Sequence, residues 1–472
     1  MYNSQPKLRC SALAFSNQGK GKERIMTRAR LIWVFAVFSL LPVLAVAAEE
    51  EITYANQVSR IMQDNCQICH QPGGIGPMSF TSYDEVRPWA PLIRLKVSER
   101  EMPPYQYDHD IGIQELKNDW RMSNEDINTI VAWVDAGSPI GNPEELPPAK
   151  EFPVPGEFQF AKELGPPDHT IKSEKWDVPA RGQDYWWEPR VPTGITENRC
   201  IKAVETIPSA AASGSTHHGV TTLLTLDENG EWEWNSLLSE FAMGKLGEKI
   251  PKGACRVAPA NSMVEWSIHY YPDGNAVADD QVTVGIWYYD EEDDFDEETA
   301  YFQDVDNYYL SKNGESDDYL IPPHGKLMTQ GFHSFDHPVR LDSWQPHMHL
   351  RGVAMSMEIF YPDTGRTELV SKVSNWSAGW NHSHTYEEGY QPLVPASAVI
   401  ILTGWHDNTA DNPWNPDPDQ WVTSGQRTGD EMSHAWIAVT HLDNEGYEKL
   451  LDERKERENR TGTALGEAEF DE

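Results

Sequence analysis

Val264-Glu265-Trp266-Ser267-Ile268-His269-Tyr270 is rich in the β-branched and aromatic residues that favour β-strands. Similar short segments lie at residues 221–225 and 282–287, and turn-forming runs such as Pro272-Asp273-Gly274-Asn275 separate them. This alternation of short β-rich segments and turn-forming runs begins near residue 170 and continues almost to the end of the chain. It is the pattern of an all-β sandwich or jelly roll.

The β-rich part is long enough for two sandwiches, which we place at residues 170–320 and 321–447. The break is expected near Ile321-Pro322-Pro323. An acidic run from Asp290 to Asp306 is interpreted as a solvated loop, with a calcium site or a cationic partner as the alternative. Residues 448–472 form a charged tail that is expected to be helical or frayed.

Cys66-Gln67-Ile68-Cys69-His70 has the CxxCH spacing of a c-type haem attachment site. Thioethers would form at Cys66 and Cys69, and His70 would become the proximal iron ligand. A chance CxxC or half of a zinc site is the alternative, but a second CxxC is absent from the chain. Met102, in Met102-Pro103-Pro104, is the expected second axial ligand. Its rivals are Met62, Met78, Met122 and His109.

Residues 48–142 are predicted to form a small helical domain around this motif. Ser123 can cap a helix, Asp126 follows three residues later, and Gly137 can end it. Apolar residues at helical spacing lie between them, namely Ile127, Ile130, Val131 and Val134. The segments CQICHQPGGIGPMSF, REMPPY and INTIVAWVDAGSPIG resemble small cytochrome c domains, in which a terminal helix places an aromatic residue, here Trp133, near the haem edge. Residues 143–169 are Pro-rich and predict an extended, semi-rigid linker.

Residues 1–47 have the features of a leader followed by a signal peptide. Arg28 to Arg30 are basic at both ends, Leu31 to Val43 are almost all apolar, and Ala45-Val46-Ala47 has the small-x-small form of a cleavage site. An uncleaved N-terminal anchor is the alternative. We therefore expect a periplasmic or secreted protein without stable membrane association.

The net charge limits the classes of macromolecule that the chain can bind, and the cysteine content predicts its disulfide. The formal net charge is −37, and removal of the basic leader makes the remaining chain still more acidic. Nucleic acid is therefore excluded as an expected partner. Apart from Cys10 in the leader and the two thiols of the CxxCH motif, the chain has Cys200 and Cys255. In an oxidising compartment this pair predicts a disulfide, with two buried thiols as the alternative.

Two groups of histidines have metal-ligand spacing. His347 and His349 form an HxH, which on a strand would present both imidazoles on one face. His217 and His218 are adjacent, so both can reach one metal only at a bulge, a bend or a strand end. Together with His269 they would form a three-imidazole site, which suits copper.

Met432 lies in the polar sequence Gly429-Asp430-Glu431-Met432-Ser433. A thioether is a soft ligand that favours Cu(I). The alternative is that Met432 is the first buried residue of the strand around Ala435 to Val439. The residues alone leave these two interpretations open.

The motifs CIKAVETIP, THHGV, IHYYPDGN, IPP, QPHMHLRG, WHDNTADNPWNPDP and TGDEM occur in this order over about residues 170–445. They resemble the copper type II, ascorbate-dependent monooxygenases, the family of peptidylglycine α-hydroxylating and dopamine β-monooxygenases. The resemblance implies two jelly-roll domains facing across a solvent-filled cleft. It also implies two coppers per chain, an electron-supplying one at His217, His218 and His269 and an oxygen-activating one at His347, His349 and Met432.

The resemblance implies hydroxylation of a C–H bond with dioxygen, on a small-molecule or peptide substrate that the sequence does not identify. We expect one covalent haem c to pass electrons to the coppers, with its edge facing the three-histidine copper. An ascorbate-like reductant or a redox protein would be the external donor. The alternatives are an electron-transfer protein or a copper-binding protein without oxygenase activity.

Overall fold

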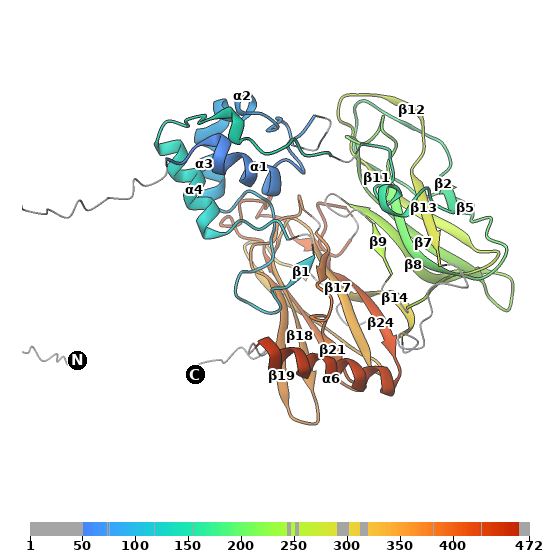
Figure 1. The fold of residues 1–472 in the computed structure, drawn as a ribbon. Coiled ribbons are helices and arrows are strands. Elements are labelled where there is room, and N and C mark those ends of the chain that lie inside the picture. Colours follow the sequence, from blue (N-terminus) through green and yellow to red (C-terminus); the bar gives the residue numbers. More distant parts are fainter. Residues whose placement is uncertain are drawn as a thin grey trace, which may run out of the picture. The chain divides into compact units, whose positions relative to one another are not determined.

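The computed structural model describes residues 51–461, apart from residues 73, 75, 118, 153, 243–246, 251–253, 290–301, 312–319, 381 and 426. The predicted leader and signal peptide at residues 1–47 lie outside this part. Most regular structure in the described part is antiparallel β-sheet, preceded by helices (Figure 1). None of the helices in the described part of the chain has both the length and the apolar character needed to cross a membrane.

Helices dominate the first ninety described residues. They are α1 (Ser59–Asn65), α2 (Tyr83–Val86), α3 (Ala90–Ser98) and α4 (Asn124–Asp135). The predicted start of α4 is confirmed, because the Ser123 hydroxyl accepts the N–H of Asp126 at 3.0 Å. Gly137 follows the helix with a φ of +87°, a left-handed conformation that glycine adopts without strain. Met62, Ile130 and Trp133 are buried in the apolar core that these helices share.

The first pair of sheets lies between residues 169 and 288. One sheet has the order β10 (Arg256–Ala258), β6 (Arg199–Ile207), β13 (Thr283–Tyr288) and β2 (His169–Lys172), with β9 (Glu248–Lys249) beside β6. The other has the order β4 (Tyr185–Trp187), β11 (Met263–Tyr270), β7 (Thr216–Leu226) and β8 (Trp232–Ala242), with β5 (Arg190–Pro192) beside β11. Val204 and Val284 from the first sheet share one apolar core with Leu223 and Trp266 from the second. The strands predicted from composition thus form β7, β11 and β13.

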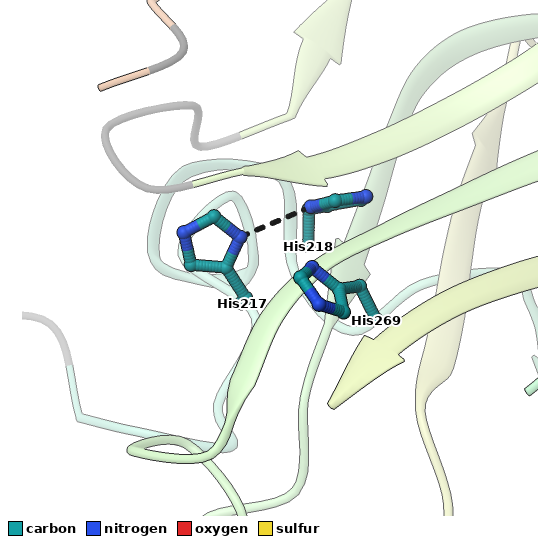
Figure 2. Close-up of side chains that lie close together, drawn as sticks. All are labelled: His217, His218 and His269. Carbon is teal, nitrogen blue, oxygen red and sulfur yellow. Dashed lines mark hydrogen bonds between the residues drawn. The ribbon is translucent and has the colours of Figure 1, made fainter. Parts of the chain in front are cut away.

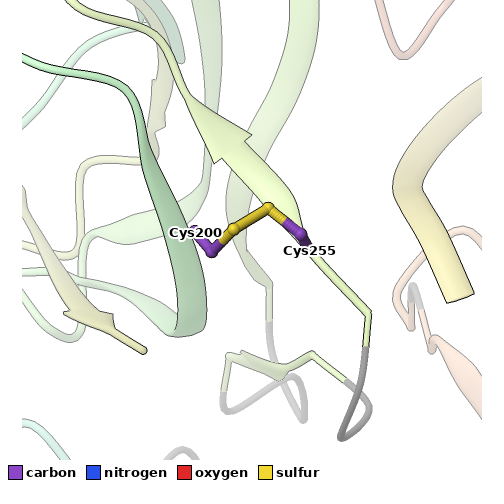
Figure 3. Close-up of a disulfide and its surroundings, with 2 residues drawn as sticks. All are labelled: Cys200 and Cys255. Carbon is purple, nitrogen blue, oxygen red and sulfur yellow. A yellow bond between two sulfur atoms is a disulfide. The ribbon is translucent and has the colours of Figure 1, made fainter. Parts of the chain in front are cut away.

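The predicted disulfide between Cys200 and Cys255 is confirmed (Figure 3). Cys200 lies in β6, and Cys255 directly precedes β10, which pairs with β6 so that Val257 is opposite Cys200. The bond joins residues 55 positions apart. It therefore ties the edge strand β10 covalently to its neighbour.

The second pair of sheets contains His347 and, apart from β1, is built from strands between residues 302 and 442. One sheet has the order β1 (Leu116–Lys117), β20 (His384–Tyr386), β17 (Val339–Met348), β24 (Ser433–Leu442) and β14 (Phe302–Ser311), with β21 (Leu393–Val394) beside β17. The other has the order β16 (Lys326–Ser334), β22 (Val399–Asp407), β18 (Gly352–Tyr361) and β19 (Arg366–Val373). Trp344 and Ile437 from the first sheet meet Met357 and Leu402 from the second in one core.

Two sequence interpretations fall in this region. The solvated loop expected from Asp290 to Asp306 is wrong for residues 302–306, which begin β14 and pair with β24; residues 290–301 lie outside the described part. Backbone hydrogen bonding with β24 outweighs the local charge there. The charged tail is helical as expected as far as Thr461, where α6 (Asn444–Thr461) ends; residues 462–472 lie outside the described part.

A segment from the helical region enters the second pair of sheets. Leu116 of β1 pairs with Tyr386 of β20. Tyr107 is 1% exposed, and its hydroxyl hydrogen bonds with the Ser371 hydroxyl of β19 at 2.8 Å. Tyr107 and Leu116 both belong to the core of the second pair. Residues 105–117, which lie inside the predicted 48–142 domain, thus help to build the fold of residues more than 200 positions later.

The Pro-rich segment 143–169 is extended only in part. It contains the 3-10 turn η3 (Pro143–Glu145) and the short helix α5 (Ala161–Leu164). The rings of Phe158 and Phe160 pack edge-on against Trp287 of β13. The Glu205 carboxylate of β6 accepts the backbone N–H of Phe160 at 3.2 Å. The last part of the predicted linker is therefore fixed to the first pair of sheets, because aromatic burial outweighs its tendency to stay extended.

Candidate functional site

His217 and His218 of β7 lie beside His269 of β11 (Figure 2). These residues are called the three-histidine set below. In the β7–β11 ladder His269 is opposite His218, but the next pair is Tyr270 with Thr216, so His217 is an extra residue in a bulge. On a regular strand, adjacent side chains point to opposite faces of the sheet. A bulge changes these directions locally, so His217 and His218 can both approach His269. As a result, one ligand atom from each histidine lies within 4.8 Å of the others.

The surroundings of His269 favour metal binding through one particular ring nitrogen. Its Nε2 lies 3.1 Å from the Asp184 carboxylate, and the Trp186 ring stacks on the imidazole at 4.1 Å between centroids. An Nε2–H donated to Asp184 leaves a lone pair on Nδ1, which is buried and has no hydrogen-bond partner. Carboxylates that orient metal-binding imidazoles have this arrangement. Neither Asp184 nor Trp186 was predicted as a site residue.

Burial lowers the pKa of all three imidazoles. The pKa of His218 falls well below its usual value, because burial is reinforced by the nearby charges of other histidines when they are protonated. These side chains are therefore neutral at pH 7. Neutral imidazole is the form that binds metals.

His347, His349 and Met432 form a second group, called the methionine set below. His347 is the penultimate residue of β17, His349 follows the strand, and Met432 directly precedes β24. Because β17 and β24 are neighbours, with His347 opposite His434, the end of one strand lies beside the start of the other. The two imidazole centroids are 5.3 Å apart. Met432 is half-buried and lines the same cavity as both histidines.

Glu431 fixes the backbone on both sides of the methionine set. Its carboxylate is fully buried and accepts the N–H groups of Met432 (3.0 Å), Arg351 (2.7 Å) and His349. Burial raises the pKa of Glu431 to about 7, while these N–H groups act in the opposite direction. His349 is further held by its Nδ1, which lies 3.2 Å from the Asp430 carbonyl oxygen. Sequence reasoning missed Glu431, although it is the neighbour of Met432.

Both sets line one cavity of about 690 Å³, called the shared cavity below. Its walls come from β7, β8 and β11 of the first pair of sheets and from β17 and β24 of the second. At its edge the Gln345 amide donates to the Glu240 carboxylate at 3.2 Å, which joins β17 to β8. Protonation of His347 or His349 would lower the pKa of His218, which places the two sets within electrostatic range of each other.

A second cavity, of about 410 Å³, surrounds the CxxCH motif and is called the thiol cavity below. Cys66, Cys69 and His70 line it, together with Met102 and Met78. The His70 Nδ1–H donates to the Met78 carbonyl oxygen at 3.0 Å, so Nε2 is the nitrogen left for a metal. An apolar cavity of this size with one imidazole and two free thiols fits a covalently attached haem.

The other candidates for the second axial ligand occupy positions that suit this role less well than that of Met102. Met62 and Met122 are buried in the helical core, and His109 Nε2 lies 3.2 Å from an Arg100 guanidinium nitrogen. Met102 and Met78 both line the thiol cavity, but the Met78 backbone is already engaged with His70. Met102 therefore stays the expected second axial ligand.

The walls of the thiol cavity come from the helical region and the second pair of sheets, whereas the haem edge was expected to face the three-histidine set of the first pair. Among the described residues that line the thiol cavity, Trp380 comes from the loop between β19 and β20 of the second pair of sheets, and none comes from the first pair. The reason is the contact of residues 105–117 with β19 and β20, which brings the helical region against the second pair.

No family model and no curated protein matches the sequence. The solved structures that match include a fucolectin from striped bass (Morone saxatilis) serum, with 11% identity over 58% of this chain and 86% of that one, at a TM-score of 0.16. The infectious bursal disease virus particle matches with 11% identity over 60% of this chain and 72% of that one, at a TM-score of 0.17. A putative α-L-fucosidase from Bacteroides ovatus has 10% identity over 67% of this chain and 43% of that one, at a TM-score of 0.16. Likeness at this level carries no argument about function.

Proposed function

We propose that the chain is a periplasmic or secreted copper-dependent monooxygenase that hydroxylates a C–H bond with dioxygen, using electrons supplied through a covalent c-type haem. The observation that carries the proposal is the shared cavity, which collects three imidazoles on one side and two imidazoles with a thioether on the other. These are unlike donor sets facing one space that is large enough for a small substrate.

The finer architecture belongs to the same proposal. Most of residues 48–142 would be a cytochrome c domain, and the two pairs of sheets would be jelly-roll domains. The expected bounds of 170–320 and 321–447 need one change, because β14 (Phe302–Ser311) and β1 (Leu116–Lys117) belong to the second pair. Helices around a CxxCH motif and antiparallel sheets packed face to face support this assignment. The motif order described above supports it independently.

Copper, when bound, supplies one-electron and dioxygen chemistry, and haem supplies electron storage. The residues of the chain hold and tune these groups. Asp184 orients His269, and Met432 offers the soft donor that favours the reduced metal. Glu431 holds the backbone of His349 and Met432 in place, so the geometry exists before a substrate enters.

The experiment is oxygen uptake by the reduced, copper-loaded protein against a panel of small molecules and peptides. Labelled dioxygen should leave one labelled oxygen atom in the product and the other in water. His347→Ala should abolish uptake and remove one of two coppers, and His269→Ala should remove the other. A protein that binds both coppers and haem but consumes no oxygen with any compound would instead be an electron-transfer protein. Copper binding without any redox turnover would indicate a copper-binding protein.

A further inference from the structure

We propose that electrons pass from the thiol cavity to the shared cavity through residues 376–380, which together with His382 are called the bridge segment below, and arrive at the methionine set. This rests on the proposed function, since it requires haem in one cavity and copper in the other. It differs from the expectation that haem serves the three-histidine set. The bridge segment belongs to neither donor set, and it forms part of the wall of both cavities.

One end of the bridge segment is fixed to the helical region. Trp380 lines the thiol cavity together with the CxxCH motif. His382 donates its Nε2–H to the carbonyl oxygen of Pro104, two residues after Met102. The Gln106 amide donates to the Ser377 carbonyl oxygen at 3.0 Å. The loop that carries Met102 and the bridge segment are therefore held together.

The other end is fixed to the methionine set. Trp376 is 2% exposed, and its Nε1–H donates to the His349 carbonyl oxygen at 3.3 Å. Its ring centroid lies 6.4 Å from that of His347. Between the two tryptophans, Ala378 and Gly379 line the shared cavity. From Trp380 to His349 the path is thus covalent except for one hydrogen bond.

The route to the three-histidine set is longer. That set lies on the wall that the first pair of sheets contributes to the shared cavity. Among the described residues, a bonded route to it runs on through β17 to the Gln345–Glu240 hydrogen bond and then along β8 and β7 to His218. Electron transfer through bonded atoms weakens less steeply with distance than transfer through solvent. The geometry therefore favours arrival at the methionine set.

The step is a single-electron transfer. A ferrous haem becomes ferric, one cupric ion at the methionine set becomes cuprous, and no atom or proton is transferred. An external one-electron reductant, such as ascorbate or a reduced redox protein, restores the ferrous haem.

The test uses the full chain loaded with haem and copper, mixed anaerobically with limiting dithionite. The rise and decay of the reduced-haem absorbance are followed by stopped flow, and cupric copper by electron paramagnetic resonance. Trp380 is half-buried, so Trp380→Leu should leave the fold intact while slowing haem reoxidation, measured per bound haem, about tenfold or more. Trp380→Phe should restore most of the rate. The matched control is Trp414→Leu, at a tryptophan that is 57% exposed and lines neither cavity.

A second arm identifies the site of arrival. Fast haem reoxidation should persist in His218→Ala, which damages the three-histidine set, and should be lost in His349→Ala. The opposite pattern, or an unchanged rate in Trp380→Leu, overturns the inference while the proposed function stands. A chain that binds no haem or no copper overturns both.

Discussion

Replacing Glu431 with alanine removes a buried carboxylate that accepts three backbone N–H groups. A buried donor that loses its partner costs about 1–3 kcal/mol, so three of them give an upper range of about 3–9 kcal/mol. Water entering the vacated space can satisfy some of these donors. We therefore expect Glu431→Ala to lower the free energy of unfolding of the second pair of sheets by about 4 kcal/mol, near the low end of that range.

A loss of this size is a large part of the total stability of a domain, which is about 5–15 kcal/mol. For a domain of about 150 residues it corresponds to a decrease of roughly 8–16 °C in the unfolding temperature. Differential scanning calorimetry of the copper-free protein at pH 8, where the carboxyl group is ionised, measures it. Copper analysis should also show weakened binding at the methionine set, because the backbone of His349 and Met432 is no longer held.

The matched control is Asp430→Ala, one residue away in the same loop. The Asp430 side chain pairs with Arg427, whose side chain is 82% exposed, so its loss should cost less than about 1 kcal/mol. Glu431→Gln keeps one oxygen acceptor and should fall between the two. The reasoning is refuted if Glu431→Ala and Asp430→Ala unfold at the same temperature and bind copper equally well.

Three further outcomes are expected. Replacing Cys200 and Cys255 together with alanine should lower the free energy of unfolding by about 4 kcal/mol, because the disulfide closes a 55-residue loop; a denaturation midpoint that still responds to reductant in the variant would contradict this. Gly76→Ala should disturb the proximal side of the haem site, since an added Cβ would lie 2.5 Å from the His70 Nδ1; the haem absorption spectrum should change, and an unchanged spectrum would show that the ring does not occupy this position. Burial lowers the pKa of His382 to about 4, so stability is full above pH 6.5 and is lost as the pH falls toward 4, by about 3 kcal/mol in total. Urea unfolding between pH 8 and 4 measures this loss, and His382→Gln should have a shallower pH dependence.

The strands of the first pair of sheets could be predicted because the residues that favour a strand lie within the strand itself. The segments at residues 221–225 and 264–270 carry β-branched and aromatic residues, and they become β7 and β11. The helix at α4 was equally readable from Ser123 and the apolar spacing after it. In each case the signal lies within a dozen residues.

From the sequence, the three histidines could be predicted to meet only on the condition that the chain bulges or bends at His217 and His218. Adjacent histidines need a bulge or a bend, and nothing in Thr216-His217-His218-Gly219 shows that one exists. The bulge is a property of the register between β7 and β11, which depends on the pairing of whole strands. The role of Glu431 was hidden for a similar reason, because two of its three backbone partners lie 80 or more residues earlier.

The contact of residues 105–117 with the second pair of sheets could not be predicted at all. A two-residue strand such as β1 has no periodicity to detect, and Tyr107 is flanked by Gln106 and Asp108 in a polar segment. Its burial depends on Ser371 and Val373, which are far away in sequence. Local sequence patterns therefore predicted the helices and strands. The position of the helical region against the second pair of sheets depends on long-range pairing and could not be predicted from them.

The same two-residue strand imposes an order on biosynthesis. Helices α1 to α4 depend on contacts between near neighbours and can form as soon as they emerge. Leu116, by contrast, must wait for Tyr386, which lies in the last quarter of the chain. Until then Tyr107 has no core to enter. The proposed haem attachment at Cys66 and Cys69 needs only the helical region, so it can precede the pairing of Leu116 with Tyr386. The proposed path between the two cavities would then be among the last features of the molecule to form.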